Sequence, residues 1–132
     1  MKKKTRLIII LSLALIIPGA LMIAIATSGV GQKAPTPPRP EGPCDIYAGA
    51  GNPCVAAHSS TRSLYAAYNG PLYQVMRQSD GKTLDIGLVA PNGNDAGGYA
   101  NAAAQDEFCA NTYCWITILY DQSGKNNHLI QA

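Results

Sequence analysis

The sequence lacks the short motifs that would place a nucleotide-binding, serine-hydrolase or nucleic-acid-binding site within its 132 residues. It has no glycine-rich phosphate-binding loop, no serine–histidine–aspartate arrangement and no basic stretch interleaved with aromatic residues. It also has no internal repeat. We therefore expect no cofactor and no nucleic-acid partner.

Metal-ligand patterns are also missing. The sequence has no Cys-x-x-Cys pair, and its two histidines, His58 and His128, are not at ligand spacing from the cysteines. Zinc sites usually show such spacing. Nothing in the sequence suggests a group that would activate a cysteine as a nucleophile. We therefore expect neither a metal site nor a catalytic thiol.

Acidic residues are absent from the first six positions, and residues 7–26 carry no charge of either sign. A basic start followed by a long apolar run is typical of a secretory signal peptide or of an N-terminal membrane anchor. Ala24-Ile25-Ala26 fits a signal cleavage site, whereas the 20-residue length fits a membrane span. Both alternatives remain open, and both predict that the rest of the chain is exported.

The basic character of the chain belongs to this targeting segment. Of ten basic residues, four lie within residues 1–6, which leaves six basic against eight acidic residues in the remainder. The exported part is therefore slightly acidic. Its charge gives no reason to expect a nucleic-acid partner.

Residues 27–43 form the next segment, and five of them between Pro35 and Pro43 are proline. Such a stretch buries no core and prefers an extended polyproline conformation. We predict a linker here and a folded part over residues 44–132. A folded part this short is near the lower limit for an independent core, which makes covalent cross-links valuable.

Four cysteines follow the export segment. An even number of cysteines in an exported chain predicts disulfides, and four allow three pairings. The short spacings of ten and five residues favour two local bridges, Cys44–Cys54 and Cys109–Cys114. Each would stabilise the fold by about 2–3 kcal/mol in the chain-entropy model.

The hydrophobic pattern predicts a chain whose core is formed by strands, with short helices and many turns. We predict a helix or turn over 57–68, strands over 72–77 and 83–89 joined by a turn at 79–82, a loop over 91–98, a helix over 99–108 and a central strand over 114–120. This is an all-β pattern of the sandwich type. Three strands cannot close a sandwich, so we expect the chain to be the first section of a larger domain.

Side chains for glycosidase chemistry are few. Retaining glycosidases need two carboxylates across a cleft, and the candidates are Asp45, Asp80, Asp85, Asp106, Glu107 and Asp121. We expect structural or solvent-exposed roles for them, with Asp121 capping backbone N–H groups of the loop that follows it. His128 is expected to orient that loop. The seven tyrosines are expected to be core or rim residues rather than sugar-stacking platforms.

Three stretches, "PCVAAHSSTRSLY", "AQDEFCANTYC" and "YDQSGKNNHL", carry a family resemblance. With them, residues 42–132 resemble the start of the catalytic domain of arabinofuranosidase B, glycoside hydrolase family 54. The resemblance implies a concanavalin-like jelly-roll sandwich and the pairings Cys44–Cys54 and Cys109–Cys114. It also implies a secreted retaining enzyme that releases terminal non-reducing α-L-arabinofuranosyl residues from arabinoxylan and arabinan.

The family's catalytic carboxylates come later in its pattern than the matching residues here, so we assign no catalytic residue. The expected partner is an arabinose-containing polysaccharide, with possible membrane anchoring through residues 7–26. Two hypotheses follow. The chain is the N-terminal part of an exported arabinofuranosidase, inactive by itself, or it is a non-catalytic carbohydrate-binding or cell-surface β-sandwich module.

Overall fold

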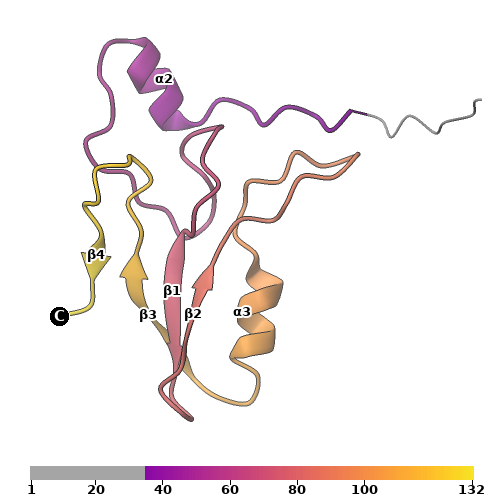
Figure 1. Ribbon diagram of the computed structural model, residues 1–132, viewed down its shortest axis with the longest axis vertical. Helices are drawn as coiled ribbons and strands as arrows, with labels where there is room; N and C mark the ends of the chain where they lie inside the picture. The colour runs from indigo at the N-terminus through magenta and orange to yellow at the C-terminus, as the bar shows by residue number, and fades with distance from the viewer. Residues whose placement is uncertain (1–34) are drawn as a thin grey trace, which may run out of the picture. The chain divides into compact units, whose positions relative to one another are not determined.

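A computed structural model describes residues 35–132 (Figure 1). The predicted signal or anchor and residues 27–34 of the predicted linker lie outside the described residues. The described part contains two short helices and four strands, in the chain order α2 Pro43–Gly49, β1 Tyr73–Arg77, β2 Thr83–Ile86, α3 Ala102–Phe108, β3 Cys114–Leu119 and β4 Leu129–Ile130. Within this part, no helix is long and apolar enough to cross a membrane.

The four strands form one antiparallel sheet in the order β2-β1-β3-β4. Strands β1 and β2 make the predicted hairpin, with Tyr73 opposite Ile86. Gly81 adopts the positive φ of +69° that its turn requires. The prediction of a central strand is confirmed, because β3 has β1 on one side and β4 on the other. The all-β prediction is confirmed as well.

Strand β2 is shorter than the prediction of 83–89, because the chain leaves the hairpin after Ile86. Leu72 donates to the Ile86 carbonyl, but Pro71 before it has no N–H to extend the ladder. Leu88 pairs with Ala100 instead, and Val89 donates to the Tyr99 carbonyl. The same contacts delay the predicted helix over 99–108, so that α3 begins at Ala102 with Asn101 as its cap.

The predicted helix or turn over 57–68 contains no helix, and a short helix that was not predicted, α2, precedes it. Several backbone N–H groups of the 57–68 segment donate to distant side chains, as Ala57 does to Asp121, and the segment forms a turn in which Tyr68 donates to the Tyr65 carbonyl. In α2, Pro43 stands in the first turn and the Asp45 carboxylate accepts from the Gly42 N–H. Both features favour a helix start.

The core lies where α3 meets the hairpin. Its buried members are Leu72, Tyr73, Val75 and Ile86, and the Tyr73 hydroxyl donates to Gln105 of α3. Phe108 and Leu119 pack around this cluster. The alternation of β1 therefore directs Tyr73 and Val75 toward α3. By contrast, β3 and β4 leave apolar side chains exposed, including Ile116 at 43% and Ile130 at 74%.

Replacing Ile86 with alanine should destabilise the fold by about 2–5 kcal/mol, because the residue is 0% exposed and its removal leaves a cavity. The matched control is Ile46→Ala on α2, since Ile46 is 60% exposed and its loss should change stability by no more than about 0.5 kcal/mol. Chemical denaturation measures both free energies of unfolding. Equal effects of the two substitutions would contradict this position of the core.

Candidate functional site

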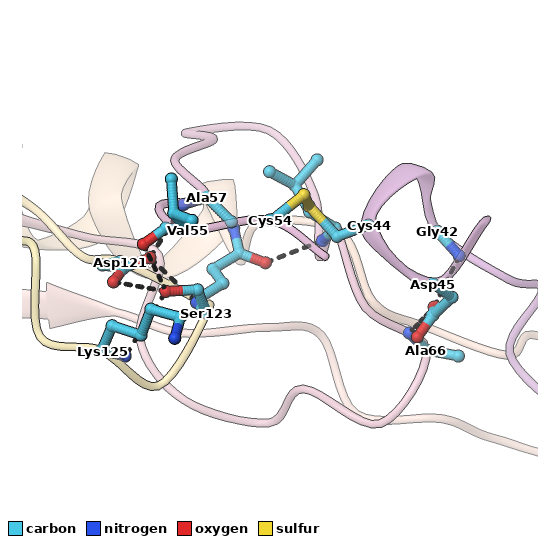
Figure 2. Close-up of a disulfide and its surroundings, with 12 residues drawn as sticks. Gly42, Cys44, Asp45, Cys54, Val55, Ala57, Ala66, Asp121, Ser123 and Lys125 are labelled. Atoms are coloured by element: carbon cyan, nitrogen blue, oxygen red, sulfur yellow. Dashed lines mark hydrogen bonds between the residues drawn. A yellow bond between two sulfur atoms is a disulfide. The ribbon is translucent and has the colours of Figure 1, made fainter. Parts of the chain in front are cut away.

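The first disulfide joins the start of α2 to the segment that follows it. Cys44 is bonded to Cys54, with 5.7 Å between their Cα atoms. The loop that this disulfide closes is held against the 64–66 segment. Cys44 donates to the Leu64 carbonyl, and the Asp45 carboxylate accepts from the Ala66 N–H (Figure 2). A Cβ on Gly42 would lie 2.2 Å from the Leu64 carbonyl oxygen, so only glycine fits there.

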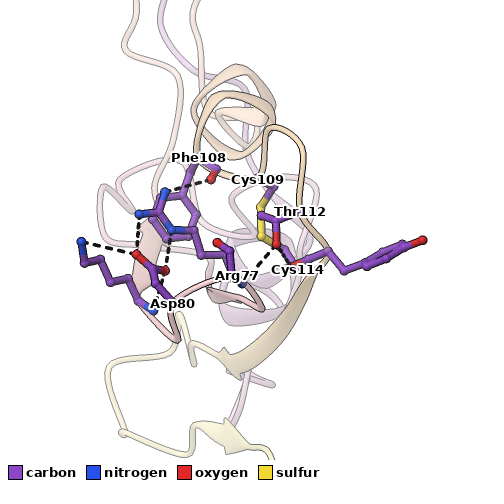
Figure 3. Close-up of polar contacts among 9 residues, drawn as sticks. Arg77, Asp80, Phe108, Cys109, Thr112 and Cys114 are labelled. Carbon is purple, nitrogen blue, oxygen red and sulfur yellow. Dashed lines mark hydrogen bonds and ion pairs between the residues drawn. A yellow bond between two sulfur atoms is a disulfide. The ribbon is translucent and has the colours of Figure 1, made fainter.

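The second disulfide, Cys109–Cys114, joins the end of α3 to the start of β3 (Figure 3). The side chain of Arg77 lies beside it, with its guanidinium 4.6 Å from the centre of the Phe108 ring. Arg77 also forms an ion pair with Asp80 across the hairpin turn, at 2.7 Å. Hydrogen bonds from Arg77 hold the pKa of Asp80 well below its usual value. These contacts lie at one end of the sheet. The carboxylate among them, that of Asp80, is already engaged in the ion pair with Arg77.

The most connected polar group in the described residues is the carboxylate of Asp121, at the end of β3. It accepts hydrogen bonds from the backbone N–H groups of Ala57 and Ser123 and from the Ser123 hydroxyl (Figure 2), and from the backbone N–H group of Asn127. Three of these donors belong to its own loop, and the fourth lies 64 residues earlier. The predicted capping role of Asp121 is confirmed, and the residue also joins two distant segments.

The side chain of Asp121 is buried, with 5% exposed. Burial opposes its ionisation, but the hydrogen bonds from Ser123, Ala57 and Asn127 outweigh burial and lower the pKa. A general acid needs a raised pKa, and a nucleophile needs a lone pair free to face the substrate. Asp121 has neither property, so its role is structural.

Gln122, next to Asp121 in the chain, makes further hydrogen bonds between the loop after β3 and the earlier segment. Gln122 is also 5% exposed; its side chain accepts from the Leu64 N–H and donates to the Arg62 carbonyl. His128 accepts from the Asp121 N–H through Nδ1, which confirms the prediction that this histidine orients the loop. The loop after β3 and the segment over 57–64 therefore hold each other in place.

The remaining candidate carboxylates do not come together as a catalytic pair. Asp85 accepts from Gln74 and from Tyr120; burial, followed by this bond to Asp85, raises the pKa of Tyr120 to about 12. Asp106 and Glu107 are exposed on α3. In the described residues no cluster of three acidic, histidine or cysteine side chains could hold a metal ion.

Two polar residues were missed by the sequence analysis. Asp95 accepts from the Gly97 N–H and from the Tyr99 hydroxyl, and the bond from Tyr99 followed by that from Gly97 lowers its pKa. Arg39, inside the predicted linker, donates to the carbonyls of Ala66 and Tyr68 and to the Asn69 side chain. The Asn-Asp-Ala-Gly-Gly sequence suggests a turn at Asp95, but no local pattern indicates the long-range contacts of Arg39.

Asp121→Asn should destabilise the protein by about 2–3 kcal/mol at neutral pH, since an amide cannot accept from all the present donors. The folded-state pKa lies below the unfolded value of about 3.9, so the unfolded chain binds more protons at acid pH. The stability from Asp121 is therefore complete above about pH 5 and decreases as the pH falls toward the folded-state pKa.

Denaturation from pH 3 to pH 7 measures this effect, and the variant should show a shallower loss of stability than the wild type. Asp106→Asn is the control, because it removes an exposed carboxylate from α3 and should change the stability by no more than about 0.5 kcal/mol. An Asp121→Asn variant with an unchanged pH profile would show that the buried carboxylate does not stabilise the fold.

The residues that form this arrangement match a known protein family. The family model "Alpha-L-arabinofuranosidase B, catalytic" matches residues 43–132, a span that includes both disulfides and the Asp121 loop. The chain is 57% identical over 113 residues to a probable alpha-L-arabinofuranosidase B of Aspergillus terreus. It is 63% identical over 91 residues to an alpha-L-arabinofuranosidase of Hypocrea jecorina.

A solved structure agrees with these matches. The crystal structure of an arabinofuranosidase complexed with arabinofuranosyl-alpha-1,2-xylobiose is 56% identical and superposes with a TM-score of 0.63. The match covers 69% of this chain and 18% of that one. The alignments with the two sequence relatives cover 86% and 69% of this chain, but only 20% and 17% of the relatives' own lengths. The chain belongs to the alpha-L-arabinofuranosidase B family and corresponds to part of its catalytic domain.

Proposed function

We propose that the polypeptide containing this chain is an exported glycoside hydrolase that releases terminal α-L-arabinofuranosyl residues from arabinoxylan or arabinan. The observation that carries the proposal is the family match over residues 43–132. It is supported by the relatives named as arabinofuranosidases and by a solved relative that holds an arabinofuranosyl-xylobiose. Residues 1–26 are proposed as the export signal or anchor, residues 27–43 as the linker, and residues 44–132 as part of the catalytic domain.

Within that enzyme the proposed role of this segment is to support the active site. A retaining mechanism needs a nucleophilic carboxylate and an acid/base carboxyl about 5–5.5 Å apart. Five of the carboxylates here, Asp45, Asp80, Asp85, Asp95 and Asp121, already accept hydrogen bonds within the fold. The pair that performs the chemistry is therefore proposed to come from polypeptide outside this segment.

Exposed apolar side chains on β3 and β4 support this role. Trp115 and Ile116 of β3 are 38% and 43% exposed, and Leu129 of β4 is 54% exposed. Ile116, Leu119, Leu129 and Ile130 also line one shallow groove. Contiguous exposed apolar surface of this kind marks an interface. We propose that further strands of the catalytic domain pack against these side chains and complete the sandwich.

A second candidate is a carbohydrate-binding module without catalysis. It is favoured by the exposed aromatic side chains of Tyr113 at 80% and Tyr47 at 58%, since amphipathic rings of this type can stack on sugar faces. The two candidates differ in turnover. They also differ in the expected effect of joining this segment to the remainder of a family catalytic domain.

The decisive measurement is release of nitrophenol from 4-nitrophenyl α-L-arabinofuranoside. We expect turnover by a polypeptide in which this segment is joined to the remainder of a family catalytic domain and none by the 132-residue chain, because the catalytic pair is proposed to lie outside this segment. The matched control is 4-nitrophenyl β-D-xylopyranoside, which should not be cleaved at a comparable rate. Turnover by the 132-residue chain would contradict the proposed role of this segment. Binding to arabinan without turnover by either protein would support the second candidate.

A further inference from the structure

A pocket separate from both disulfides lies where the end of the predicted linker meets the domain. Three segments line it, with Arg39 from the linker, Arg62 and Ser63 from the second, and Gly98 and Tyr99 from the third. Its volume is about 300 Å³, which is enough for a monosaccharide. The walls are fixed, since Arg62 and Tyr99 form an antiparallel bridge and Ser63 donates to the Gly98 carbonyl at 2.8 Å.

The pocket carries positive charge that the chain does not neutralise. All eight acidic side chains lie within the described residues, and the ion pairs among them involve only Asp80, with Arg77 and Lys82. Neither Arg39 nor Arg62 forms an ion pair with any of the eight. Arg39 is held by neutral acceptors only, including the Ala66 carbonyl at 3.2 Å and the Asn69 side chain at 3.1 Å. Arg39 and Arg62 both line the pocket, and their positive charge favours a carboxylate or another oxyanion.

The hydroxyl groups of the pocket narrow the choice of anion. The Tyr99 hydroxyl donates its proton to Asp95 at 2.7 Å, and the Ser63 hydroxyl donates to the Gly98 carbonyl at 3.2 Å. Since these protons are already used, both oxygens present lone pairs to a ligand. The pocket therefore combines charged donors with neutral acceptors. A ligand that matches it has an anionic group and hydroxyl groups that donate.

Gly98 allows the close approach of Arg39. Its φ is +89°, and a Cβ there would lie 2.6 Å from Cδ of Arg39 and 3.1 Å from the Ser63 hydroxyl. A side chain at this position would therefore displace the arginine and enter the pocket. Arg39 also precedes the family match, which begins at residue 43. The pocket thus combines a residue of the preceding segment with residues of the catalytic domain.

We propose that this pocket binds a uronic acid, with the sugar carboxylate at Arg39 and Arg62 and sugar hydroxyl groups donating to Ser63 and Tyr99. The uronate would be a substituent or backbone unit of an acidic polysaccharide, and this source rests on the proposed function. The pocket would hold the polymer while a different site performs the cleavage.

Sodium D-glucuronate is the probe, titrated into the purified protein and followed by NMR shifts of the residue 62 and 98 amides. We expect saturable binding that weakens at least about tenfold in Arg62→Gln, whose exposed side chain can be replaced without loss of the fold. Lys125→Gln removes an exposed cation outside the lining of this pocket and should leave the affinity unchanged. Arg39→Gln should also weaken binding, with unfolding checked by circular dichroism.

Two further probes test the ligand class. D-Glucose lacks the carboxylate, and sulfate lacks donating hydroxyl groups at neutral pH, so both should bind at least about tenfold more weakly than glucuronate. Equal affinity for glucose would show that the arginines do not select the ligand. Equal affinity for sulfate would show that the pocket does not select a uronate over other anions. Either result would overturn the proposal. No saturable glucuronate binding, or an unchanged affinity in Arg62→Gln, would overturn the proposal.

Glucuronoxylan and neutral arabinan distinguish a polymer from a free sugar acid as the source. Tighter binding of glucuronoxylan than of glucuronate, lost in Arg62→Gln, supports a polysaccharide partner; binding of the monosaccharide alone overturns that part. The aryl arabinofuranoside carries no carboxylate, so its hydrolysis tests the proposed catalytic function without involving this pocket. The two proposals can therefore fail separately.

Discussion

Most of the described chain is neither helix nor strand, so many of its backbone N–H groups need side-chain acceptors. An unpaired buried N–H is costly, and a buried carboxylate with several donors is one of the few groups that can satisfy more than one. Asp121 does this for Ala57, Ser123 and Asn127, while Asp45 serves Gly42 and Ala66. These two carboxylates hold irregular segments against the sheet and are therefore unavailable for catalysis.

The sheet and the irregular segments differed in how well the sequence predicted them, and the reason is the range of their interactions. Strands β1, β2 and β3 follow from alternating or β-branched residues and from a local turn. The 57–68 segment contains residues that suit a helix, yet three of its N–H groups bond to acceptors 21 to 64 residues away. Local propensity cannot reveal such partners. The capping role of Asp121 was predictable because Gln-Ser-Gly follows it, but its bond to Ala57 was not.

The two disulfides act on different parts of this arrangement. Cys44–Cys54 closes a loop whose other attachments are hydrogen bonds to residues 64–66, so the bridge and Asp45 reinforce one contact. Cys109–Cys114 closes the tight connection between α3, which covers the core, and β3, which is central in the sheet. In a folded part this small, a cross-link beside the core also limits how far the packed elements can separate.

Proline content gave a linker that ends at residue 43, whereas the contacts of Arg39 connect the end of that stretch to the domain. A proline-rich composition indicates that a segment buries no apolar core. It does not indicate whether a single long side chain of that segment contacts the surface of the domain. Arg39 does so through three neutral acceptors, which fix its guanidinium without neutralising it. An arginine held in this way keeps its charge available to a ligand. The region that the sequence presents as a spacer therefore also completes a charged pocket on the domain that it precedes.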